Sequence, residues 1–147
     1  MKNLITKSLA IMGLFFMVAV GSVQAQTPAG AEVNIPFDFS AGKATLKAGV
    51  YRIKQQAGSV LAISSADGKK TSLLDAPLTI GSRDFKAGSR LVFNRYDDQY
   101  FLSQVWLNVD TGKQLFTSRA ETRAAREYRL AKKNAKPERV EIAVSRR

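Results

Sequence analysis

Short segments that alternate between apolar and polar residues constrain the fold of this chain more than any other feature of its sequence. In the first segment, Val33, Ile35, Phe37 and Phe39 are separated by polar residues or proline. Side chains of a strand point alternately to the two faces of a sheet, so a period of two predicts a strand with one buried face. Residues 33–39 are therefore expected to form a strand.

About eight such segments follow one another at intervals of roughly ten residues, with turn-forming residues between them. The clearest are 33–39, 50–54, 60–64, 70–75, 90–96, 99–107 and 139–144. Turns are expected at Asp67-Gly68, at Asp97-Asp98 and over residues 110–113, because Asp and Gly favour tight turns. The spacing predicts a mainly β protein with antiparallel strands, either a small β-barrel or a β-sandwich, and Trp106 is expected to anchor its core.

One helix is expected late in the chain, over residues 119–133. Ser118 and Glu121 match a capping box, and the segment contains neither Gly nor Pro. A helical period places one set of residues on the face expected to pack on the sheet: Ala120, Ala124, Tyr128 and Ala131. It places a basic set on the opposite face: Arg119, Arg123, Arg126 and Lys133.

The N-terminus has the features of a secretory signal peptide. Lys2 and Lys7 precede an apolar stretch over residues 9–20, and small residues before Gln26 predict cleavage between Ala25 and Gln26. Residues 1–25 are thus the predicted signal, 26–31 a linker, and 32–147 a single domain. No second long apolar run follows, so no membrane span is expected in the mature chain, and the predicted location is periplasmic or secreted.

Composition removes several classes of function. The chain has no cysteine and no histidine, which excludes disulfides, Ser-His and Cys-His nucleophiles and the usual zinc, copper and iron sites. A carboxylate-only hydrolase stays open, but no motif supports it, and neither a metal nor a cofactor is expected. Removing Lys2 and Lys7 from 23 basic residues leaves 21 against 12 acidic ones, a net charge of +9. In an export compartment this charge favours anionic envelope polymers, lipid headgroups or an acidic protein over nucleic acid.

Two groups of residues are candidate sites. At the predicted hairpin tip, a polar and aromatic cluster could hold a ligand or cation, or could simply form the turn: Arg95, Tyr96, Asp97, Asp98 and Tyr100. The basic face of helix 119–133 could bind phosphate or carboxylate groups, or could be a solvated surface. The expected function is non-catalytic binding of a ligand or partner, or a structural role, after export.

Three segments resemble small exported proteins of environmental bacteria that are usually described as hypothetical. They are 35–39 (IPFDF), 46–52 (LKAGVYR) and 91–106 (LVFNRYDDQYFLSQVW). Such proteins often carry Pro where this chain has Lys47 and Gly where it has Asp97. The resemblance implies export and a β-rich fold, and it implies no activity.

Overall fold

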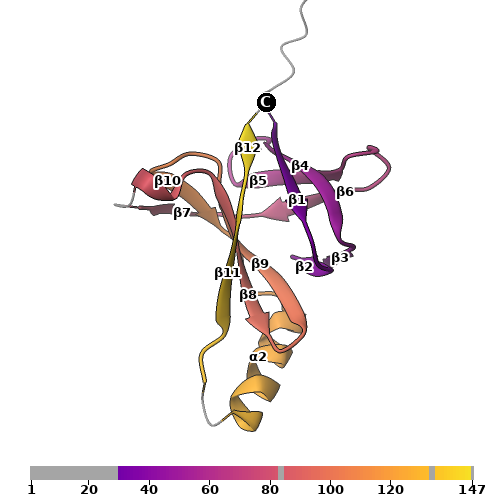
Figure 1. Cartoon of the computed structure of the whole chain (residues 1–147), viewed down its shortest axis with the longest axis vertical. Helices are drawn as coiled ribbons and strands as arrows, with labels where there is room; N and C mark the ends of the chain where they lie inside the picture. The colour runs from indigo at the N-terminus through magenta and orange to yellow at the C-terminus, as the bar shows by residue number, and fades with distance from the viewer. Residues whose placement is uncertain (1–29, 83–84, 133–134, 147) are drawn as a thin grey trace, which may run out of the picture.

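The computed structural model describes residues 30–82, 85–132 and 135–146. Two β-sheets and one α-helix make up this part of the chain (Figure 1). The predicted signal peptide, its cleavage site at Ala25 and Gln26, and Lys133 lie outside the described residues. The sheets do not close into a cylinder, so of the two predicted architectures the protein has the sandwich.

The first sheet has five antiparallel strands in the order β12-β1-β4-β5-β6. They are β1 (Ala31–Ile35), β4 (Gly49–Gln55), β5 (Val60–Ser65), β6 (Thr71–Asp75) and β12 (Ser145–Arg146). Strand β1 therefore begins inside the segment predicted as a linker, with Ala31 already buried.

The second sheet is built around the predicted central hairpin. Its path is β11-β8-β9-β10-β7, and the short pair β2 and β3 joins it through β9. The strands are β2 (Phe39–Ala41), β3 (Ala44–Leu46), β7 (Leu78–Gly81), β8 (Arg90–Tyr96), β9 (Gln99–Trp106), β10 (Thr111–Gln114) and β11 (Glu138–Ala143). The 3₁₀ turn η1 (Phe85–Ala87) precedes β8. All these pairings are antiparallel except one parallel bridge, Ser40 with Phe101.

Two strand predictions were wrong in detail. The expected strand 33–39 is split into β1 and β2, because Pro36 has no N–H for a ladder and the chain leaves the first sheet there. Residues 111–114, expected largely as a turn, form β10 and pair with β7 and β9. Gly112 fits in this strand because the indole of Trp106 lies where a side chain would otherwise be.

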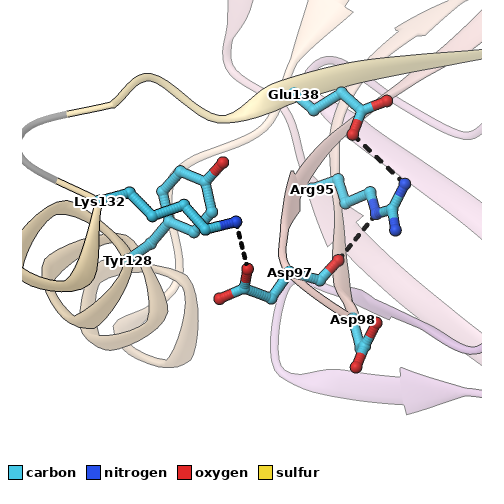
Figure 2. A pocket seen from close by; sticks show the side chains of 6 residues that line it. All are labelled: Arg95, Asp97, Asp98, Tyr128, Lys132 and Glu138. Carbon is cyan, nitrogen blue, oxygen red and sulfur yellow. Dashed lines mark hydrogen bonds and ion pairs between the residues drawn. The ribbon is translucent and has the colours of Figure 1, made fainter.

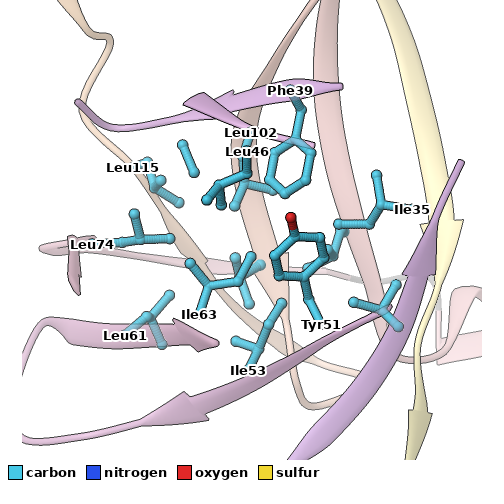
Figure 3. Packing of buried hydrophobic residues seen from close by; sticks show 14 of the residues in the cluster. Ile35, Phe39, Leu46, Tyr51, Ile53, Leu61, Ile63, Leu74, Leu102 and Leu115 are labelled. Atoms are coloured by element: carbon cyan, nitrogen blue, oxygen red, sulfur yellow. The ribbon is translucent and has the colours of Figure 1, made fainter. Parts of the chain in front are cut away.

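Apolar side chains from both sheets fill the space between them (Figure 3). Ile35 and Ile53 come from the first sheet, while Phe93 and Leu102 come from the second, and all are essentially buried. The ring of Phe93 makes T-shaped contacts with the rings of Phe37 and Phe39, at centroid distances of 5.2 and 5.5 Å. Trp106 is buried, as predicted, but it lies over Gly112 and beside Arg90 rather than in either apolar cluster.

The helix α2 (Arg119–Ala131) lies at one end of the second sheet, against β8 (Figure 1). The Ser118 hydroxyl accepts a hydrogen bond from the N–H of Glu121 at 3.1 Å, as a helix N-cap does. The face that meets the sheet is shifted by one position from the prediction. It contains buried Glu121 and Ala124 and half-buried Ala125 and Tyr128, whereas Ala120 and Ala131 are exposed.

Candidate functional site

A cavity of about 380 Å³ opens where the β8–β9 hairpin tip, the end of α2 and the start of β11 meet (Figure 2). Asp97 and Asp98 form the two-residue connection of the hairpin, since Tyr96 pairs with Gln99. Asp97 has a φ of 53°, the left-handed conformation that favours Gly and tolerates Asp. The predicted turn at these aspartates is thereby confirmed.

Charged side chains that line the cavity are mostly paired with one another. Lys132 Nζ lies 2.7 Å from an Asp97 carboxylate oxygen, and this contact raises the pKa of Lys132. The Arg95 guanidinium lies 3.3 Å from the Glu138 carboxylate, and its Nε donates to the Asp97 carbonyl oxygen at 2.7 Å. These contacts tie the hairpin tip to α2 and to β11. Asp98 and Tyr128 complete the lining.

The two tyrosines of the predicted hairpin cluster lie on opposite faces of the sheet, and Tyr100 is in contact with Arg95. By register, Arg95 and Tyr100 share one face of the sheet, while Tyr96 and Gln99 share the other. The Tyr96 ring is buried under α2 against Phe101, and Tyr100 stacks on Phe37 with ring centroids 3.8 Å apart. Hence Arg95, Asp97 and Asp98 face the cavity, and the tyrosines of the hairpin serve packing.

The acidic side chains of the cavity are mostly engaged in contacts within the protein. Among the described residues, no group of three carboxylates is placed to hold a metal ion. Two of the three acidic side chains lining the cavity, Asp97 and Glu138, are already in ion pairs. The arrangement joins three elements of the fold, and it leaves little unpaired charge for a ligand.

Glu121 is a buried carboxylate that the sequence interpretation placed in a helix cap. Its side chain turns under α2, where the Asn94 amide donates to Oε1 at 2.8 Å and the Tyr96 hydroxyl lies 3.5 Å from the same oxygen. Burial raises the pKa of Glu121, and these two hydrogen bonds partly oppose the rise. The helical spacing of 121, 124, 125 and 128 is the sequence signal that could have identified the inward face.

We expect Glu121→Gln to increase stability at neutral pH relative to the wild type. The pKa of Glu121 is raised in the folded protein, so the protonated carboxyl stabilises the fold relative to the charged one. This contribution to the free energy of unfolding is fully present below pH 4.5, the pKa in the unfolded chain, and is lost as pH rises through the folded-state pKa. Gln is uncharged and keeps an acceptor oxygen for Asn94, so the variant should escape this loss. Urea unfolding at a series of pH values measures the difference between the two proteins.

Glu127→Gln is the matched control, because it removes the same charge from the exposed side of α2. A stability difference between wild type and Glu121→Gln that is the same at every pH would contradict the assignment of Glu121 as a buried carboxylate.

The outer face of α2 carries unpaired positive charge. Arg119, Arg123, Arg126 and Leu130 follow one another at helical spacing and are all exposed, Leu130 at 77%. We call these four residues the arginine face. Within the part of the chain that the structure describes, none of the three guanidinium groups has an ion-pair or hydrogen-bond partner. The predicted basic face is confirmed for these arginines, and Lys133 cannot be placed.

Most acidic side chains that could neutralise this face are engaged elsewhere. The ion pairs of the described residues use five carboxylates, each with a basic residue outside the arginine face: Glu32, Asp38, Asp97, Glu138 and Glu141. Glu121 points inward, and Glu127 makes no ion pair with Arg123, its neighbour one turn away, in the described structure. The positive charge of α2 therefore projects into solvent.

Among the helices formed by the described residues, none has the length and apolar character needed to cross a bilayer. Comparison with known proteins gives no match to any family model, curated protein or solved structure.

Proposed function

We propose that this protein is exported and acts without catalysis, by docking through the arginine face onto anionic lipid headgroups of the cell envelope. The observation that carries the proposal is the set of three exposed guanidinium groups without partners on one side of α2. Guanidinium groups bind phosphate oxygens in pairs, and an anionic leaflet attracts each basic residue near its surface.

Leu130 favours a lipid surface over a soluble acidic protein or polysaccharide. Its side chain is 77% exposed and lies among the arginines rather than on the apolar side of α2. On a soluble polyanion this side chain would gain little, whereas at a bilayer it can enter the boundary between headgroups and acyl chains. The opposite side of α2 packs on β8 and β9, so the helix presents its basic side without unfolding.

Export is supported by the predicted signal at residues 1–25. The protein recovered from the exported fraction is expected to begin at Gln26. That form is the one to use for the binding measurements.

The test is co-sedimentation with vesicles of phosphatidylglycerol and phosphatidylcholine, compared with vesicles of phosphatidylcholine alone. Arg119→Gln, Arg123→Gln and Arg126→Gln together should weaken binding to the anionic vesicles about 100-fold, from about 1 kcal/mol for each basic residue. Binding should also weaken as salt rises, because exposed charges are screened. Leu130→Ser should weaken vesicle binding and leave binding to soluble polyphosphate unchanged.

A matched control removes three positive charges elsewhere: Lys43→Gln, Lys54→Gln and Lys69→Gln. The affinity of this variant for anionic vesicles should stay within about threefold of the wild-type affinity, if the position of the charges matters more than the net charge of the protein. Equal losses in the two triple variants, or binding that persists at high salt, would overturn the proposal. Preference for an acidic protein over vesicles would overturn the lipid assignment.

A further inference from the structure

Strand β6 leaves one side of the first sheet open. It is the terminal strand of that sheet, and it pairs with β5 on its other side. The short sequence Thr-Ser-Leu-Leu-Asp contains no proline and no basic residue. Leu74 points into the sandwich, whereas Leu73 points away from it and is 69% exposed.

The register with β5 identifies which backbone groups of β6 are free. Ser65 N–H donates to the carbonyl of Lys70, and Ala76 N–H donates to the carbonyl of Ser59. Hydrogen-bonded pairs alternate along an antiparallel ladder, so residues 70, 72, 74 and 76 bond to β5. The N–H and C=O groups of Thr71, Leu73 and Asp75 therefore point outward at the open edge.

Two of the other edge strands carry features that block strand addition, whereas β7, at the far end of the second sheet, has four uncharged residues and β6 has one charged residue, Asp75. Strand β11, at the edge of the second sheet, has Glu138, Arg139 and Glu141 on it, and β12 has two residues. Charged residues and short strands prevent sheets from joining edge to edge. At β6 the outward-facing positions are filled by Thr71, Leu73 and Asp75.

We propose that two copies of this chain pair through β6 in antiparallel orientation, with a two-fold axis at Leu73. The outward groups of Leu73 then pair with those of Leu73 in the second copy, and Thr71 pairs with the second copy's Asp75. Each matched position exchanges two backbone hydrogen bonds, so the free groups at both edges are satisfied. The two exposed Leu73 side chains meet on the same face of the joined sheet.

Charge favours this arrangement over addition of an unrelated strand. Lys69 and Lys70 precede β6 and Asp75 ends it, so the strand is basic at its start and acidic at its end. Antiparallel self-pairing brings the start of one copy beside the end of the other. The two lysines at the start of one copy's strand then lie near the end of the strand that carries the second copy's Asp75, so charges of opposite sign adjoin at both ends. This inference is independent of the arginine face and of lipid binding.

The decisive experiment uses a single cysteine in a chain that has none. Residues of a hydrogen-bonded antiparallel pair have Cα atoms about 5.5 Å apart, within the range that a disulfide spans. Leu73→Cys should form a covalent dimer under mild oxidation of the exported protein. Leu78→Cys on β7 is the control, since Leu78 is also exposed, at 51%, and should cross-link at least about tenfold more slowly.

Sedimentation velocity on unmodified and charge-changed proteins gives a second, non-covalent measurement. The wild type should be dimeric at micromolar concentration, and Leu73→Lys should weaken dimerisation about tenfold or more by opposing like charges at the axis. Asp75→Lys should also weaken it, because the substitution places a positive charge beside Lys69 and Lys70 of the second copy. A wild type that stays monomeric, or a Leu73→Cys protein that cross-links no faster than Leu78→Cys, would overturn the proposal. Capture of a different protein's strand by a monomeric wild type would also overturn it.

Discussion

Gly112→Ala is expected to destabilise the protein by about 3 kcal/mol, the upper part of the range for overpacked sites. A Cβ at this position would lie 2.5 to 2.8 Å from three ring atoms of Trp106, much closer than real side chains approach. The ring cannot easily move, because it is buried and the Arg90 guanidinium lies 4.4 Å from its centroid. Chemical denaturation followed by far-UV circular dichroism measures the loss.

Gly81→Ala is the matched control for this substitution. Gly81 lies on the neighbouring strand β7, opposite Thr111, and an added Cβ would meet nothing closer than a backbone oxygen at 3.9 Å. Its cost should be about 1 kcal/mol or less. In a Trp106→Ala background, Gly112→Ala should lose most of its effect, because the two sites are in contact. An additive result would show that the clash with Trp106 is not the cause.

Phe93→Ala is expected to cost about 3–5 kcal/mol, the usual range for removing a buried aromatic ring. Phe93 is fully buried on β8, and its ring contacts Phe37 and Phe39 edge-on between the two sheets. Truncation leaves a cavity at the point where the second sheet meets the turn after β1. The free energy of unfolding in urea, obtained by linear extrapolation, gives the size of the loss.

Phe116→Ala separates loss of a ring from loss of packing, since Phe116 is 61% exposed. It should change the free energy of unfolding by no more than about 0.5 kcal/mol. Similar losses for Phe93→Ala and Phe116→Ala would contradict the packing of the two sheets around Phe93.

Local sequence patterns predicted strands and turns well where a strand pairs with its neighbour in the sequence. The β8 segment 90–96 and the turn at Asp97-Asp98 were predicted because alternation and turn chemistry act over neighbouring residues. The break between β1 and β2 was missed, although Pro36 was recognised as a poor ladder residue. A single proline does not reveal that the chain crosses from one sheet to the other.

Tertiary contacts decided what local patterns could not. Alanines define a helix face weakly, so the inward side of α2 was predicted one position off and buried Glu121 was missed. Its partner Asn94 is 27 residues away. The contribution of Lys132 to the hairpin cavity was missed for the same reason, since it pairs with Asp97 across the gap between two elements. The three arginines of the arginine face needed only helical spacing and were predicted, whereas Leu130 was not part of the predicted basic face.

Trp106 is the only tryptophan in the chain, and its burial gives the protein a built-in optical probe. An indole shielded from water emits at shorter wavelength than one in solvent, so unfolding of the second sheet shifts the emission towards the red. The ring lies over Gly112 of β10 and beside Arg90 of β8, which places the fluorophore across three adjacent strands. Emission from this one residue therefore reports whether those strands remain assembled, without any label attached to the protein.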